Sequence, residues 1–117
     1  MHGTGVPLVT PFDESGDVDE ARLRELVGWV ESRGVDFVVP CGSNSESELM
    51  GVTERARVVE IVVDEATGDV LAGTGHPGFR ETLRQTNLAA EAGADAALVV
   101  TPFYFPHDQA TFGAYYR

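Results

Sequence analysis

Small polar residues follow a short apolar run near position 40, where a binding loop would be expected. Gly42 lets the backbone turn sharply, and Ser43 and Asn44 then offer hydroxyl, amide and backbone N–H donors close to the predicted start of a helix. Such a helix end carries unpaired donors and a partial positive charge, which favour a bound carboxylate or phosphate. The loop alone favours the plainer interpretation, an ordinary Ser/Asn helix cap without a ligand.

Tyr104 follows the apolar run at 96–100 and is a second candidate for chemistry. A tyrosine hydroxyl at the end of a strand can relay protons or bind a substrate. Taken alone, the residue is better interpreted as a half-buried aromatic side chain. Cys41 also stands at a strand end, but small buried cysteines are common, so we expect it to pack rather than to act as a nucleophile.

The remaining polar residues contain no motif for a metal or a dinucleotide. The three histidines, His2, His76 and His107, are far apart and share no ligand spacing, so we expect no metal site. The acidic turn at 13–17 lacks the spacing and the closing glutamate of an EF-hand loop, which argues against calcium. Gly-Thr-Gly at 73–75 is too short for a dinucleotide fingerprint. We therefore expect no cofactor.

A pattern that recurs three times indicates the elements that position these residues. In each repeat a helical stretch ends near Gly34, Gly68 or Gly93, and a continuous apolar run follows. Glycine just past a helix commonly takes the left-handed conformation that ends it. Unbroken apolar runs are typical of parallel strands covered on both faces. Together with a first run, strands are predicted at 6–9, 37–40, 70–72 and 96–100.

Helices are predicted between these strands from caps and apolar periodicity. Asp17 and Glu20 resemble a capping box ahead of the first helix, and Thr53 is a good N-cap for the second. A third helix is predicted at 78–92, and a fourth begins near Gln109. Alternating strands and helices predict an α/β fold with a parallel sheet and helices outside it.

The loops that follow the strands should lie together. Ligands of α/β folds bind at the C-terminal ends of the parallel strands. Each predicted strand is followed by a polar or glycine-rich loop, and these loops contain Thr10, Ser43, Thr74 and Tyr104. We therefore expect these four residues on a common rim.

The charge balance excludes some classes of partner. The chain has 19 acids and 8 bases, a net charge of -11, and every base is an arginine. Such a surface repels nucleic acid and anionic lipid, so we expect neither a nucleic-acid nor a membrane partner. An acidic surface without lysine suits a high-salt cytoplasm, which we favour over an ordinary acidic protein.

The remaining signals indicate a cytoplasmic protein. No stretch approaches the ~20 apolar residues that span a bilayer. The first residues have neither the basic nor the long apolar region of a signal peptide. Cys41 is the only cysteine, so no disulfide can form within the chain.

Several loop segments, taken in order, resemble one known family. Gly-Val-Pro-Leu-Val-Thr-Pro-Phe at 5–12 resembles the opening of the dihydrodipicolinate synthase/N-acetylneuraminate lyase family. Gly-Ser-Asn-Ser-Glu-Ser at 42–47 resembles its Gly-[Thr/Ser]-Thr-Gly-Glu-[Ser/Asn] signature. The resemblance continues along nearly the whole chain at 53–55, 72–75, 93–95 and 101–104. Each piece is weak alone, but the ordered set is specific.

The resemblance implies the N-terminal half of a (β/α)8 (TIM) barrel, with about four parallel βα units. Family members join pyruvate to an aldehyde, or reverse that reaction, through a Schiff base on a barrel lysine. Ser43 and Asn44 would hold the pyruvate carboxylate, and Thr10 would lie near the site floor. Tyr104 would complete a proton relay, often across a subunit interface, and the full-length protein would be a homo-oligomer.

Two positions depart from the family signature. Asn44 stands where the signature has its second threonine, and Ser45 stands where it has its second glycine. Asparagine can still donate to a carboxylate, whereas serine makes a left-handed turn harder. The loop could therefore differ in shape, and the resemblance does not settle the substrate. An enzyme like 4-hydroxy-tetrahydrodipicolinate synthase or a 2-keto-3-deoxy sugar acid aldolase is implied.

The chain contains no lysine, whereas the family's Schiff-base lysine and central tyrosine lie beyond the fourth strand. Arginine cannot replace that lysine, because it stays protonated and is not nucleophilic. We therefore expect a chain truncated after strand four and the start of helix four, and inactive alone. The alternative is a non-catalytic half-barrel that binds a partner chain or a small carboxylate. A phosphate-binding barrel enzyme would need a glycine-rich loop after later strands.

Overall fold

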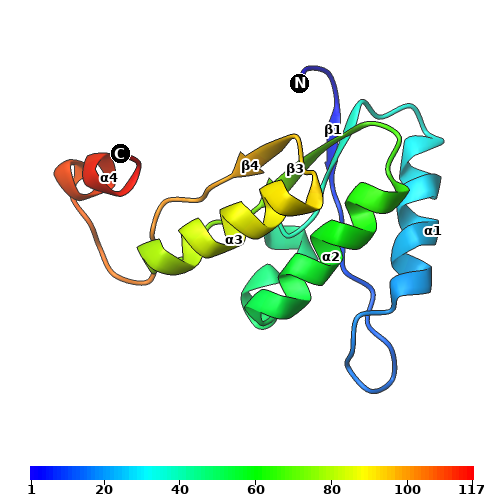
Figure 1. Cartoon of the computed structure of the whole chain (residues 1–117), viewed down its shortest axis with the longest axis horizontal. Helices are drawn as coiled ribbons and strands as arrows, with labels where there is room; N and C mark the ends of the chain where they lie inside the picture. The colour runs from blue at the N-terminus through cyan, green and yellow to red at the C-terminus, as the bar shows by residue number, and fades with distance from the viewer.

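The computed structural model describes residues 1–117 and contains one four-stranded sheet. Its strands are parallel and lie in chain order: β1 (Gly5–Pro7), β2 (Phe37–Val39), β3 (Asp69–Gly73) and β4 (Ala96–Leu98). Each is followed by a helix: α1 (Glu20–Glu31), α2 (Val52–Glu65), α3 (Phe79–Ala92) and α4 (Gln109–Tyr115). Figure 1 shows this arrangement, which confirms the predicted α/β order and the parallel sheet.

The first three helices lie side by side, with α2 packed against both α1 and α3. Crossovers between parallel strands are right-handed, so consecutive units place their helices on the same face of the sheet. The short helix α4 lies apart from this layer, beyond the end of β4 (Figure 1). It is anchored by Tyr115, whose hydroxyl donates to the carbonyl oxygen of His76 at 2.8 Å.

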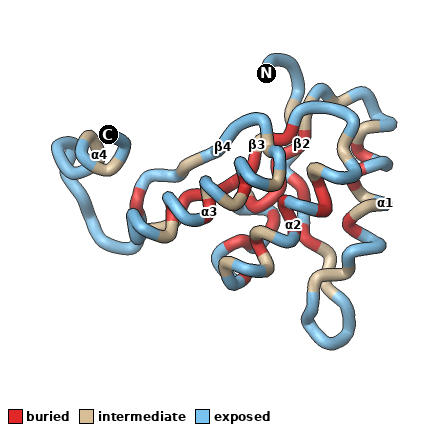
Figure 2. The backbone as a smooth tube through the Cα atoms, viewed as in Figure 1, coloured by how far each residue is buried: buried red, intermediate tan, exposed pale blue.

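The core lies between the sheet and these three helices (Figure 2). Burying one large aliphatic side chain contributes about 1.5–3 kcal/mol, so such a cluster dominates the stability of the fold. All three residues of β4 are exposed, in contrast to those of β2. The most deeply buried aliphatic side chains are Leu8, Leu23, Val27, Val38, Val58, Ile61, Val62 and Val70.

The predicted caps of the first two helices were wrong. The N-cap of α1 is Asp19, not Asp17, because the Asp19 carboxylate accepts the N–H of Arg22 at 3.0 Å. The N-cap of α2 is Gly51, which places Thr53 within the helix. There the Glu54 carboxylate accepts the Gly51 N–H at 2.8 Å, so a side chain inside the first turn satisfies the helix end.

The glycines that end the helical stretches do not all act alike. Gly34 and Gly93 have φ values of 83° and 98°, as the left-handed prediction required. Gly68 does not take a positive φ. A Cβ there would lie only 2.9 Å from the carbonyl oxygen of Asp36, so close backbone approach explains this glycine. The helices are also too short or too polar to cross a membrane.

Candidate carboxylate-binding site

A cavity of about 560 Å³ opens at the C-terminal end of the sheet. It is bounded by the segments that follow β2, β3 and β4, so the predicted meeting of these loops is observed. Most of its lining is polar or glycine. The residues around it are Cys41, Gly42, Ser43, Glu46, Ser47, Glu48, Arg55, Gly73, Gly75, Leu98, Val100, Thr101 and Phe103.

The loop after β2 forms two short 3₁₀ turns, η1 (Ser43–Ser45) and η2 (Ser47–Leu49), before α2 begins. Ser43 and Asn44, which were predicted close to the start of a helix, open the 3₁₀ turn η1 rather than α2. The first N–H groups of a 3₁₀ turn also lack partners within the turn, so the donor character remains. Ser43 lines the cavity, whereas Asn44 is exposed and is not part of the lining.

The left-handed residues of this loop are not at the position that the signature suggested. Cys41 has a φ of 57° and Glu46 a φ of 56°, while Ser45 lies inside η1. Serine in place of glycine therefore strains nothing at position 45. The turn occurs one residue later, at Glu46.

Thr10 is buried beneath this loop and does not reach the cavity. Its hydroxyl donates to the carbonyl oxygen of Ser45 at 2.8 Å, and the Ser45 hydroxyl donates to the carbonyl oxygen of Leu8 at 2.5 Å. These two bonds join the end of β1 to η1. Thr10 thus lies at the floor of the loop, where it fixes the backbone that carries Ser43.

Thr74 and Tyr104 differ in how they relate to the cavity. Thr74 is buried, and its hydroxyl lies 2.8 Å from that of Thr86, so its neighbours Gly73 and Gly75 line the cavity instead. Tyr104 has a φ of 80°, is 88% exposed and packs edge-on against Phe105. Its hydroxyl is therefore not brought into the cavity by residues 1–117.

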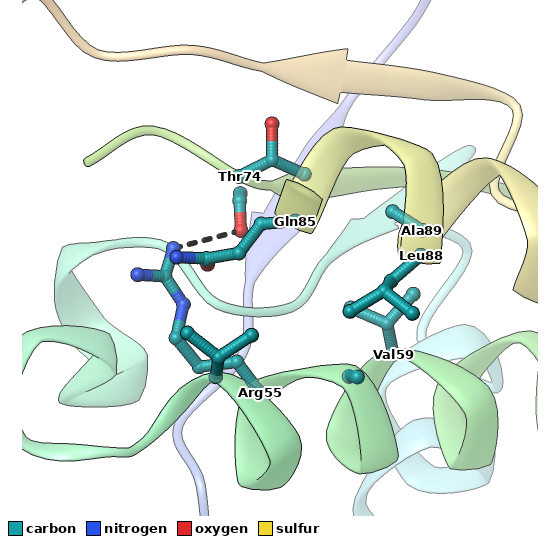
Figure 3. A pocket seen from close by; sticks show the side chains of 9 residues that line it. Arg55, Val59, Thr74, Gln85, Leu88 and Ala89 are labelled. Carbon is teal, nitrogen blue, oxygen red and sulfur yellow. Dashed lines mark hydrogen bonds between the residues drawn. The ribbon is translucent and has the colours of Figure 1, made fainter. Parts of the chain in front are cut away.

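Sequence reasoning did not single out Arg55, which is buried in the first turns of α2 and lines the cavity. Its Nη2 donates to the carbonyl oxygens of Gly73 and Gly75 at 3.1 and 3.3 Å. Figure 3 shows the side chain reaching from α2 towards Thr74 and Gln85. From the sequence, an arginine next to a helix start is predicted to lie on the surface. Arg55 is buried because α2 packs against β3.

Cys41 is buried, as predicted, and it packs against the same arginine. Its thiol donates to the carbonyl oxygen of Arg55 at 3.6 Å, and the side chain is buried. Burial raises the pKa of the Cys41 thiol to about 11, despite the nearby Arg55 charge, which lowers it. A thiol in that range is a poor nucleophile at neutral pH.

This fold and site define a class: four βα units of a parallel barrel, with a polar cavity at the C-terminal rim. The family model of the dihydrodipicolinate synthetase family matches residues 1–117. The chain belongs to this family.

Three comparisons place the chain within the family. It is 43% identical over 106 residues to a 4-hydroxy-tetrahydrodipicolinate synthase of Thermomicrobium roseum, covering 89% of this chain and 35% of that protein. It is similar to the 2-keto 3-deoxygluconate aldolase of Picrophilus torridus, with a TM-score of 0.93 and 26% identity, covering 99% of this chain and 43% of that protein. It is also similar to YagE of Escherichia coli K12 in complex with pyruvate, with a TM-score of 0.94 and 28% identity, covering 99% of this chain and 40% of that protein.

These coverages agree with the architecture. The chain spans less than half of the length of the relatives it matches. Its four βα units have the fold of the N-terminal half of a (β/α)8 barrel.

Proposed function

We propose that these residues form the carboxylate-binding part of a pyruvate-dependent Schiff-base lyase. The observation that carries the proposal is the open start of η1, where Ser43 presents its hydroxyl and N–H beside a cavity of about 560 Å³. YagE, whose structure contains pyruvate, has the same fold over this region. Ser43 would bind the pyruvate carboxylate, and the exposed Asn44 would add an amide donor.

In the proposed reaction, a lysine amine condenses with the pyruvate ketone, releasing water and forming an imine. Loss of a methyl proton then gives a carbon nucleophile that attacks the aldehyde carbonyl. The 117 residues contain no lysine, so the proposal requires that the lysine come from outside them. Donors at the rim would hold the carboxylate and so orient the ketone towards that amine.

Tyr104 has a distinct place in this proposal. Its side chain is almost fully exposed and is not part of the cavity lining, although Thr101 and Phe103 on the same segment line the cavity. A hydroxyl in that position can serve a neighbouring site more readily than its own. We propose that Tyr104 relays protons in the site of a second subunit, which makes the active form a homo-oligomer.

The proposed acceptor is an aldehyde, and two classes fit the relatives. One is the semialdehyde used by a 4-hydroxy-tetrahydrodipicolinate synthase, and the other is the aldehyde product of a 2-keto-3-deoxy sugar acid. The first class has support in the 43% identity to the Thermomicrobium roseum protein. The second has support only in the fold and in 26% identity.

Borohydride trapping with pyruvate tests the proposal. The full-length protein should form a reduced covalent adduct on a lysine, located by peptide mass spectrometry. Changing Ser43 and Asn44 together to alanine should raise the pyruvate concentration for half-maximal trapping about tenfold or more, because hydrogen bonds to a charged group are lost. The control is Ser15→Ala, in an exposed turn. Absence of any adduct in the full-length protein would refute the imine chemistry.

A non-catalytic half-barrel is the second candidate. The exposure of every residue of β4 favours it, since an uncovered strand suits a partner chain. Analytical ultracentrifugation distinguishes the lyase from the non-catalytic half-barrel. The 117-residue chain is measured alone and mixed with a polypeptide made of the residues that follow β4 in the relatives. A stable complex that forms no adduct with pyruvate would favour this candidate.

A further inference from the structure

Arg55 differs from the arginines that form ion pairs on the surface in its electrostatic surroundings. Arg22, Arg24 and Arg57 each lie within ion-pair distance of carboxylates on the surface. Arg55 is only 4% exposed, yet none of the ion pairs in the structure includes it. A buried charge without an opposite charge is costly, so such a group normally has a counter-ion.

The hydrogen bonds of Arg55 leave part of its guanidinium free. Nη2 serves the carbonyl oxygens of Gly73 and Gly75, while Nη1 makes no hydrogen bond within the chain. Nε is buried without a partner, and so is Oε1 of Gln85. Arg55 and Gln85 both line a small pocket of about 10 Å³. A pocket of that size has room for about one water molecule. Figure 3 shows side chains that line it, Arg55 and Gln85 among them. Nη1 is not among the enclosed atoms, and the larger cavity is the open space that Arg55 lines.

We propose that Arg55 is a second anion-binding residue of the cavity and receives a carboxylate that is separate from the one held by Ser43. The guanidinium is planar and fixed by two carbonyl oxygens, so its remaining donors are already oriented. Guanidinium donors match a carboxylate, and the attraction is stronger away from bulk water. No other basic residue lines the cavity.

The acidic residues of the cavity restrict which ligands Arg55 can bind. Glu46 and Glu48 line the same space, but neither lies within 4.0 Å of the Arg55 guanidinium nitrogens. Their charge works against an anion, so only an acid group placed directly on Arg55 is favoured. The ligand is therefore a small compound with two acid groups, or a carboxylic acid bound beside a monocarboxylate. The choice of pyruvate as the first occupant rests on the proposed function, whereas the anion site at Arg55 does not.

Calorimetric titration of the full-length protein tests the assignment. Succinate, with two carboxylates, should bind at least tenfold more tightly than butyrate, which has one. Arg55→Met should abolish that preference, a loss equivalent to about 1.4 kcal/mol or more. Arg22→Met, which removes an exposed arginine paired with Asp19, should leave it unchanged. An unchanged succinate preference in Arg55→Met would overturn the proposal.

A second titration separates the two sources of the carboxylate. With pyruvate saturating, acetate that still binds through Arg55 indicates a separate acid. Failure of acetate to bind through Arg55 with pyruvate saturating, while succinate binds through Arg55 in the absence of pyruvate, indicates that one ligand spans both positions. Binding of acetate that does not depend on Arg55 under either condition contradicts the inference. The borohydride experiment is independent of this one. A normal pyruvate adduct together with an unchanged succinate preference in Arg55→Met would therefore refute only this inference.

Loss of folding in Arg55→Met would not leave the question open. The side-chain N–H resonance of Arg55 can be followed by NMR in the unaltered protein during a succinate titration, with Arg55→Lys used for assignment. A saturable shift of the Arg55 Nε–H signal supports the proposal. A signal that stays fixed while succinate binds elsewhere overturns it.

Discussion

The hydroxyl of Thr10, at the end of β1, lies 2.8 Å from the carbonyl oxygen of Ser45 and donates to it. Thr10 and Ser45 are both buried, so this bond joins the segment after β1 to η1 out of contact with water. It places η1, and with it the candidate carboxylate donors of Ser43, on a fixed support.

Thr10→Val should therefore destabilise the protein and loosen η1. The change keeps the shape of the side chain but leaves the buried Ser45 carbonyl without its donor, which costs about 1–3 kcal/mol. Urea unfolding followed by circular dichroism measures the loss. Thr53→Val, at an exposed position in α2, is the control and should stay within about 0.5 kcal/mol of the unaltered protein. Equal effects of the two changes would show that the buried bond contributes nothing.

Gly73→Ala should be far more damaging than its size suggests. A Cβ at position 73 would lie 2.0 Å from the carbonyl oxygen of Cys41, and the obstacle is backbone rather than a flexible side chain. We expect a loss of about 3 kcal/mol, with the two loops forced apart. Gly28→Ala, in the interior of α1 with no atom within 4 Å of the added Cβ, should instead gain about 0.5–1 kcal/mol. Thermal unfolding of both variants checks the opposite signs.

The contrast between Gly28 and Gly73 illustrates what the sequence could predict. The order of elements followed from continuous apolar runs and from helix-ending glycines, which are local signals. The meeting of the loops followed from the rule for parallel sheets, and the cavity confirms it for the loops after β2, β3 and β4. Of the four residues expected on a common rim, only Ser43 lines the cavity, whereas Thr10, Thr74 and Tyr104 do not. No local signal distinguishes a glycine in open space from one pressed against another strand, because that depends on pairs distant in sequence.

The site shows the same division at the level of single residues. Ser43 could be predicted to line the cavity because loop chemistry and strand order suffice for that. Arg55 could not, because its burial depends on how α2 packs against the end of β3. The exposure of Tyr104 outside the cavity lining also escaped prediction, since a positive φ at a tyrosine is set by its surroundings rather than by its own preference.

The ion pair between α1 and α2 should make stability depend on acid pH. The side-chain hydrogen bond from Arg57, at 2.8 Å, holds the pKa of Glu20 below its ordinary value of 4.5. The folded state then binds fewer protons than the unfolded state, so the stabilisation is present above that value and is lost as the pH falls through the lowered pKa. Glu20→Gln should therefore lose less stability on acidification than the unaltered protein.

Urea midpoints at low ionic strength, measured from about pH 6 to pH 3, check this difference. Glu25→Gln is the matched control, because Glu25 is an exposed acid on the same helix and belongs to no ion pair. An acid dependence of Glu20→Gln that matches that of the control would contradict the assigned role of Arg57.

Cys41 should resist alkylation in the folded protein. Burial raises its pKa from 9.0 to about 11, so little thiolate exists at about pH 8. The unfolded thiol releases its proton first, and stability should therefore fall as the pH rises above 9.0. Mass spectrometry after iodoacetamide treatment should show slow labelling that becomes fast in denaturant. Labelling at the same rate in both conditions would show that the thiol is open to solvent, and the single cysteine makes the result unambiguous.

Added salt should stabilise the protein, in keeping with the proposal of an acidic surface suited to high salt. The net charge of -11 destabilises the compact state by self-repulsion. Raising KCl from about 0.1 M to about 1 M shortens the screening length from about 10 Å to about 3 Å, which weakens that repulsion more than it weakens the few close ion pairs. We expect the unfolding temperature to rise over this range.

A variant with Glu14, Glu25 and Glu91 all changed to glutamine removes exposed acids that form no ion pair, and the rise in its unfolding temperature should be smaller. A flat or falling unfolding temperature would mean that the ion pairs outweigh the repulsion, and equal rises in the two proteins would assign the effect to apolar burial, which concentrated salt also strengthens.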